Sequence, residues 1–146
     1  MKLAEKYVRE EMKDTHDVLG GYISPCHPSY IFQKLGTTMC LPGSTRNHLI
    51  DLGVQDDPTW MLDPYMSSTE KFVDNTLVLK AFSQRLNCDD KDIFWVMGTD
   101  NFWGGMVEDA LSQVPNMQCI VVENRDAESA KVFRDRVQAR GVKGVH

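Results

Sequence analysis

Apolar residues follow two different spacings along this chain, and the spacing predicts where helices and strands lie. Leu3, Ala4, Tyr7, Val8 and Met12 recur at helical spacing, whereas KDIFWVMG (91–98) and MQCIVVEN (117–124) are apolar runs typical of buried strands. By the same criteria we expect helices over 1–13, 44–54, 67–86, 100–114 and 126–141. We expect strands over 17–24, 59–65, 91–98 and 117–124, and a last strand starting at VKGVH.

Helices and strands therefore alternate, which is typical of an α/β protein with a parallel sheet and helices on both of its faces. Ser44 is the predicted N-cap of the second helix, and Ser-Ser-Thr-Glu (67–70) is a capping-box pattern that predicts the start of the third. We expect residues 17–24, 91–97 and 117–122 to be parallel strands of one sheet, within a single domain that covers 1–146.

Charge and composition exclude several classes of function. A net charge of -5 argues against a general binder of nucleic acid or of membrane surfaces, and no apolar run has the roughly 18 residues of a membrane span. The first residues are too charged for a signal peptide. The four cysteines and four histidines are scattered without a C-x-x-C pair, so we expect reduced thiols in an intracellular protein and no protein metal site.

Parallel sheets bind ligands at the carboxyl ends of their strands, where three motifs are expected. Ser24-Pro25 follows the first predicted strand, DPYMSS (63–68) the second, and GTDNF (98–102) the third. Gly98 permits a close approach of a ligand, and Asp100 can accept hydrogen bonds from ribose hydroxyls or a base amine. The structural alternatives are that Asp100 only caps a helix, and that Pro64 and Ser67 only end a strand and begin a helix.

Taken together, four motifs resemble the nicotinamide mononucleotide adenylyltransferases, which belong to the Rossmann-like nucleotidyltransferase superfamily. They are GGYISPCHPSYIFQKLG, LPGSTR, DPYMSS followed by FVDNTLVL, and VMGTDNF, in the family's order over about residues 1 to 125. The resemblance implies a reaction in which AMP is transferred from ATP to nicotinamide mononucleotide, giving NAD and pyrophosphate with Mg²⁺. The implied partners are these two nucleotides, and the implied process is NAD biosynthesis.

The family's two catalytic motifs, His-x-Gly-His and I-S-S-T-x-x-R, do not occur in this sequence. By alignment the first would fall just before Met1 and the second just after His146. The strand that carries the first motif is central to the family's sheet. We therefore interpret the chain as an internal portion of a longer protein, incomplete at both ends, or as a family member without catalytic residues.

The resemblance also implies several nucleotide-binding residues. Tyr30 and Lys34 match a nucleotide-contacting tyrosine and lysine, and Phe72 stands where the family commonly stacks nicotinamide on tryptophan. Trp103 could line the nicotinamide pocket and Arg125 could meet a phosphate. Four of them have a structural alternative: Lys34 and Arg125 as solvated cations, Phe72 as a core residue, and Trp103 as a helix-packing aromatic.

Two neighbouring features receive structural interpretations. We expect Arg46 to pair with a carboxylate rather than with a ligand. Cys26 and His27 are adjacent in an extended loop, where neighbouring side chains point apart, so we do not expect a nucleophile and base.

Two hypotheses follow. In the first, the complete protein is an adenylyltransferase. In the second, the fold is a catalytically inactive interaction module whose sheet is completed by other protein chains.

Overall fold

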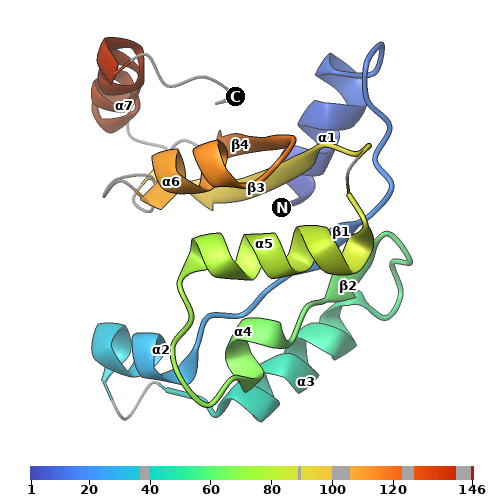
Figure 1. Cartoon of the computed structure of the whole chain (residues 1–146), viewed down its shortest axis with the longest axis vertical. Coiled ribbons are helices and arrows are strands. Elements are labelled where there is room, and N and C mark those ends of the chain that lie inside the picture. Colours follow the sequence, from blue (N-terminus) through green and yellow to red (C-terminus); the bar gives the residue numbers. More distant parts are fainter. Residues whose placement is uncertain (37–39, 89, 100–105, 123–126, 141–145) are drawn as a thin grey trace. The chain divides into compact units, whose positions relative to one another are not determined.

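The computed structural model describes residues 1–36, 40–88, 90–99, 106–122, 127–140 and 146. Within these ranges helices and short parallel strands alternate, so the chain is an α/β protein (Figure 1). The chain divides into two compact units, which are described separately: one comprises Met1–Tyr7 with Asn75–His146, and the other comprises Val8–Asp74. None of the described helices is long and apolar enough to cross a membrane.

The larger unit is built on a pair of parallel strands. β3 (Ile93–Gly98) pairs with β4 (Met117–Val122), with Ile93 opposite Met117 and Gly98 opposite Val122. This pairing confirms the prediction that these two segments are parallel. His146 lies against the other edge of β4, where its N–H donates to the Cys119 carbonyl and its carbonyl accepts from the Val121 N–H, at 2.8 and 2.9 Å. Residues 141–145 of the predicted last strand lie outside the described residues.

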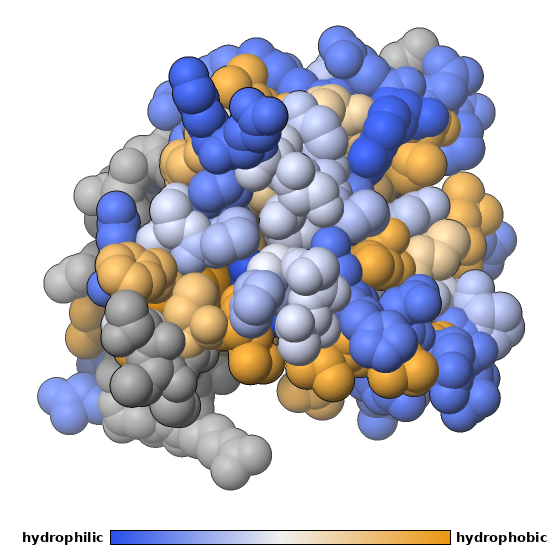
Figure 2. Space-filling model, turned by 90° about the horizontal axis from the view of Figure 1, so that it is seen from below, coloured by the Kyte–Doolittle hydropathy of each residue, from blue (hydrophilic) through white to orange (hydrophobic). Residues whose placement is uncertain are grey.

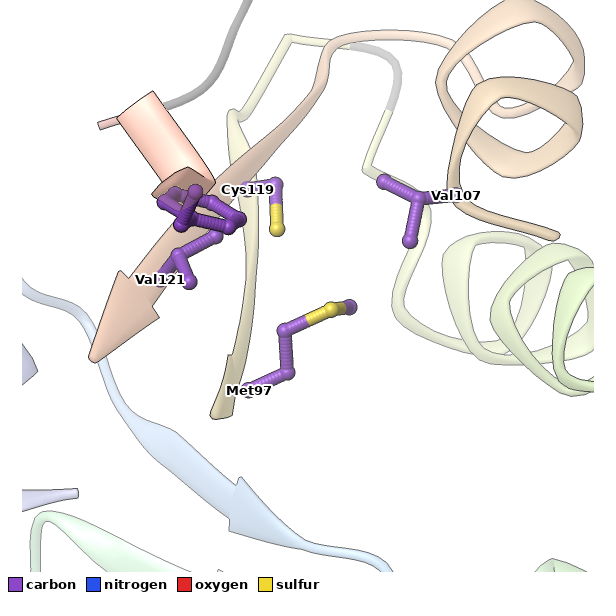
Figure 3. Packing of buried hydrophobic residues seen from close by; sticks show 5 residues of the cluster. Met97, Val107, Cys119 and Val121 are labelled. Atoms are coloured by element: carbon purple, nitrogen blue, oxygen red, sulfur yellow. The ribbon is translucent and has the colours of Figure 1, made fainter. Parts of the chain in front are cut away.

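Alternation along β3 and β4 sends side chains to both faces of the pair. One face packs against α5 (Asn75–Leu86), α6 (Met106–Gln113) and α7 (Ala127–Arg140). Its core includes Met97, Val107, Cys119 and Val121, whose side chains converge in Figure 3. On the other face Leu3, Ala4 and Tyr7, from the start of α1 (Lys2–Glu11), line a small cavity of about 220 Å³ with β4. Helices thus cover both faces of this pair, as predicted.

The smaller unit holds the second pair of strands. β1 (Gly21–Ile23) is parallel to β2 (Trp60–Leu62), with Gly21 opposite Trp60. An added Cβ at Gly21 would collide with the Trp60 ring, so a larger residue here would require that ring to move. α2 (Pro28–Leu35), α3 (Gly43–Val54) and α4 (Tyr65–Ser68) complete the unit.

The prediction of one continuous sheet is wrong for the described residues, since β1 pairs with β2 and β3 pairs with β4 in two separate sheets. Residues 17–24 were also predicted as one strand, yet only Gly21–Ile23 is paired. The apolar pattern identifies where a strand lies, but its partner depends on contacts distant in sequence.

The predicted helix over 67–86 is two helices, α4 and α5, joined by residues 69–74. Thr69 ends α4 in an extended conformation, and its carbonyl oxygen accepts a hydrogen bond from the His27 ring instead of continuing a helix. Ser67 is therefore a buried residue inside α4 and not the N-cap of a long helix. Ser44 is also not an N-cap, because α3 begins one residue earlier with Pro42 in that position.

Candidate functional site

The carboxyl ends of β1 and β2 lie side by side, because the two strands are parallel and in register. Ser24 follows β1, and Asp63 follows β2. The ladder continues for one more bond, since the Asp63 N–H donates to the Ile23 carbonyl at 2.9 Å. The motifs beginning at Ser24 and Asp63 thus meet at one strand edge, as expected for loops after parallel strands.

Asp63 is the buried carboxylate of this edge, with only 4% of its surface exposed. Its Oδ2 accepts a hydrogen bond from the Ser24 hydroxyl at 3.1 Å, and its Oδ1 accepts one from the Tyr65 N–H at 3.4 Å. A buried carboxylate requires such donors to offset the loss of water. Asp63 therefore joins the loop after β1 to the first turn of α4.

His27 positions the next helix. Its Nδ1 accepts from the Ser29 N–H at 3.1 Å, which makes it the N-cap of α2, and Nδ1 also lies 2.7 Å from the Ser29 hydroxyl. Because an N–H can only donate, Nδ1 carries no proton, and Nε2 donates to the Thr69 carbonyl at 3.1 Å. Both ring nitrogens are thus engaged with partners other than Cys26. The expectation that Cys26 and His27 do not form a nucleophile and base agrees with this arrangement.

Arg46 joins three segments around the same edge. Its Nη1 donates to the Cys26 carbonyl at 2.8 Å and its Nε to the Leu41 carbonyl at 3.1 Å. The prediction that Arg46 pairs with a carboxylate is wrong among the described residues, because the loops present carbonyl oxygens at this position. Its Nη2 is buried without a partner in the described part of the chain. Among the described residues, this guanidinium therefore keeps one N–H group without an acceptor.

A close contact fixes α3 against α4. An added Cβ at Gly43 would lie 2.6 Å from the Ser67 carbonyl oxygen, so only glycine permits this approach. Nearby, the Ser67 hydroxyl donates to Asn47 Oδ1 at 2.7 Å. The start of α3 and the residues of α4 are therefore held together by packing and by a partly buried hydrogen bond.

The structure brings Phe72 to this edge. Phe72 is 51% exposed, so the interpretation of this residue as core is wrong, and its ring contacts His27 edge-on with centroids 6.3 Å apart. Tyr30 lies on the helix that His27 caps and is 37% exposed. The Lys34 Nζ lies 6.0 Å from the centroid of the Tyr30 ring. Two exposed aromatic rings and a cation thus come from segments that His27 connects.

Of the other predicted residues, only Gly98 is described. Gly98 is the last residue of β3 in the larger unit, where it is half-buried and precedes the buried Thr99. Asp100, Trp103 and Arg125 lie outside the described residues.

Sequence reasoning missed α2, which was interpreted as loop, and with it the capping role of His27. The signal was present, since Pro28 directly after a polar residue is typical of a first helical position, and Gly36 of a helix end. It also missed Asn47, whose side chain points to Ser67 only because α3 packs on α4.

No family model matches the chain, and no curated protein matches it either. The fold and the site define an α/β protein with two parallel strand pairs and a polar, aromatic strand edge. They do not define a family.

Proposed function

We propose that the carboxyl edge of β1 and β2 binds a nucleotide, and that the complete protein is a nicotinamide-nucleotide adenylyltransferase with a Rossmann-like fold. The observations that carry the proposal are the exposed Phe72 ring against His27, the Lys34 Nζ near the Tyr30 ring, and Arg46, which donates to the Cys26 carbonyl and whose Nη2 has no partner among the described residues. Aromatic faces stack on bases, while lysine and arginine donate to phosphate oxygens. The order of motifs described above supports the same assignment.

The proposed reaction places a phosphate of nicotinamide mononucleotide against the α-phosphorus of ATP. A P–O bond forms between them as the bond to pyrophosphate breaks, so the protein has to align two anions and stabilise the developing charge. This chain would contribute base stacking and phosphate contacts. Mg²⁺ commonly binds through substrate phosphates with few protein ligands, so the proposal needs no protein cage for it.

Two matched phenylalanines provide the test. Phe72 and Phe32 are equally exposed, at 51% and 50%. Phe32 lies two residues from both Tyr30 and Lys34 on α2, which places it on a different side of that helix. Phe72→Ala should weaken binding of nicotinamide mononucleotide or ATP by about 1–3 kcal/mol, the usual value of one base–aromatic stack. Phe32→Ala should leave binding unchanged.

Calorimetric titration of each nucleotide into the folded variants measures this difference. Equal nucleotide affinities for the two variants would show that Phe72 does not contact the nucleotide. A folded protein that binds neither nucleotide would contradict the proposed function.

Lys34 is tested in the same way against Lys13, an exposed lysine in the same unit. Lys34→Gln and Lys13→Gln remove the same charge, but only the first should weaken binding and reduce its dependence on salt.

Asp100→Ala should likewise weaken nucleotide binding by about 1–3 kcal/mol if Asp100 serves the ligand. A loss of thermal stability with unchanged affinity would instead assign Asp100 to helix capping.

The interaction module remains the second candidate because both described sheets contain only two strands. A two-stranded unit is marginally stable alone, and parallel strands are usually covered on both sides by further elements. In this alternative other chains complete the sheets. It predicts partner-dependent protection of β1 and β3 amides in hydrogen exchange, with no effect of nucleotide.

A further inference from the structure

A groove on the smaller unit runs along β2 and the last turns of α3, with a volume of about 450 Å³. Its apolar lining includes Val54, Pro58, Trp60, Met61 and Leu62. Met61 is 36% exposed although it is a large apolar side chain within a strand. The groove therefore presents apolar side chains to solvent beside the polar side chains of Asp51, Gln55 and Asp57, and it extends as far as Pro64.

Carboxylates border this apolar surface. Asp51 and Asp57 line the groove, and Asp56 is adjacent to Asp57 in sequence. Asp57 Oδ1 accepts a hydrogen bond from the Thr59 N–H at 3.1 Å, which fixes the turn into β2. Asp51 and Asp56 are exposed, and in the described part of the chain neither has a hydrogen-bond or ion-pair partner. Their charge is thus available to a ligand.

The surrounding sequence supplies no compensating cation. Residues 47–70 contain no lysine and no arginine, although they hold Asp51, Asp56, Asp57, Asp63 and Glu70. Residues 92–124 also contain no lysine and no arginine, so the groove is distinguished by the apolar side chains that lie beside its carboxylates. On the face of the molecule shown in Figure 2, hydrophobic residues are exposed between hydrophilic ones. The groove therefore combines two properties. It exposes apolar side chains, and it is bordered by the exposed carboxylates of Asp51 and Asp56 in a segment without basic residues.

We infer that this groove binds a basic segment of a partner protein, in which an apolar residue lies between lysine or arginine residues. The apolar residue would cover Met61 and Val54, while the cations would pair with Asp51 and Asp56. A second copy of this chain fits less well, because its net charge is -5 and two copies repel each other. A nucleotide fits less well again, because phosphates would meet carboxylates.

The inference does not depend on the proposed nucleotide site. The groove uses residues of α3 and β2, and none of Tyr30, Lys34 or Phe72 lines it. Removing charge from Asp51 and Asp56 should therefore leave nucleotide affinity unchanged.

The probe is a short capped peptide of leucine and lysine, compared with the same peptide carrying glutamate in place of lysine. Asp51→Asn combined with Asp56→Asn should weaken binding of the lysine peptide about three- to tenfold, as expected for the loss of two exposed ion pairs. The matched control combines Glu11→Gln with Asp14→Asn, which removes the same charge from exposed positions of the same unit outside the groove. This control should bind as the unchanged protein does.

Three further results support the inference: no binding of the glutamate peptide, weaker binding at high salt, and weaker binding by Met61→Ser. If the groove variant and the control lose the same affinity for the lysine peptide, the effect arises from net charge alone and the inference is overturned. Binding of both peptides alike would overturn it too. A third outcome would also overturn it. If the protein does not bind the peptide but self-associates in sedimentation, and the Asp51 and Asp56 changes abolish this self-association, then the groove binds a second copy of the chain.

Discussion

Cys119 is the clearest case of a single residue whose chemistry is set by its surroundings. It is fully buried in the core cluster of the larger unit (Figure 3), and burial raises the pKa of its thiol from 9.0 to about 12. Between these pH values the unfolded chain has released a proton that the folded protein still holds. The stability supplied by the neutral thiol is therefore complete below pH 9.0 and is lost as the pH rises towards 12.

We expect the free energy of unfolding to fall with rising pH over this interval, and to fall less in Cys119→Ala. Urea denaturation at a series of pH values measures both slopes. Folded protein should also resist thiol reagents at Cys119 and react there only after denaturation. Parallel slopes for the two proteins would mean that burial of this thiol does not govern the alkaline side of the stability profile.

His27 gives the second prediction at the scale of a residue. It caps α2, donates to the Thr69 carbonyl and is 7% exposed. His27→Ala removes the cap and leaves the Thr69 carbonyl without this donor, so the free energy of unfolding should fall by about 1–2 kcal/mol. His48→Ala, at an exposed position in α3, is the control and should change stability little. A similar small change for both variants would show that the hydrogen bonds of His27 add little to the free energy of unfolding.

At the scale of elements, α3 contains two glycines with opposite surroundings. A Cβ at Gly43 would lie 2.6 Å from the Ser67 carbonyl oxygen, whereas a Cβ at Gly53 would meet nothing within 4 Å. Gly43→Ala should destabilise the protein by about 1–3 kcal/mol because backbone has to move. Gly53→Ala should stabilise it by about 0.5–1 kcal/mol through helix propensity.

Chemical denaturation measures the free energy of unfolding of both variants, and because both changes lie in α3 they can be compared directly. A stable Gly43→Ala protein would show that α3 and α4 do not need their close approach. A loss of stability in Gly53→Ala would show that its position is not open.

The elements also show where apolar patterning succeeds and where it fails. β3 and β4 were identified because six apolar-rich residues in a row fit a buried strand between helices. α4 and α5 were merged because residues 69–74 break the helix through backbone geometry, while the sequence around Phe72 and Val73 keeps an apolar pattern. Asn87 and Asn116 have positive φ angles of 50° and 54° just after α5 and shortly after α6, consistent with the tolerance of asparagine for that conformation.

At the scale of the whole molecule, the proposed function makes separate predictions for nucleotide binding and for catalysis. The sequence contains no His-x-Gly-His, the motif that stabilises the transferring phosphoryl group in the family that we propose for it. Loss of one charge-stabilising donor already costs roughly a hundred- to a thousandfold in rate. Purified residues 1–146 should therefore form no measurable dinucleotide from ATP and nicotinamide mononucleotide, even where either one binds.

Chromatographic detection of dinucleotide after long incubation measures this. Turnover by the purified chain, absent from a sample treated with denaturant, would contradict the prediction and would locate catalysis among the residues present here.

The sequence by itself determined the α/β class, the parallel direction of β3 and β4 and the placement of two motifs after strands. These follow from local spacing, since helical and strand periodicities differ and the carboxyl ends of parallel strands share one edge. Only the tertiary structure decided that β1 pairs with β2, that Phe72 is exposed, that Arg46 binds carbonyls and that His27 donates to Thr69. Each of these depends on what a segment distant in sequence places opposite the residue. Hydrogen-bond partners and burial arise from packing, which local spacing does not encode.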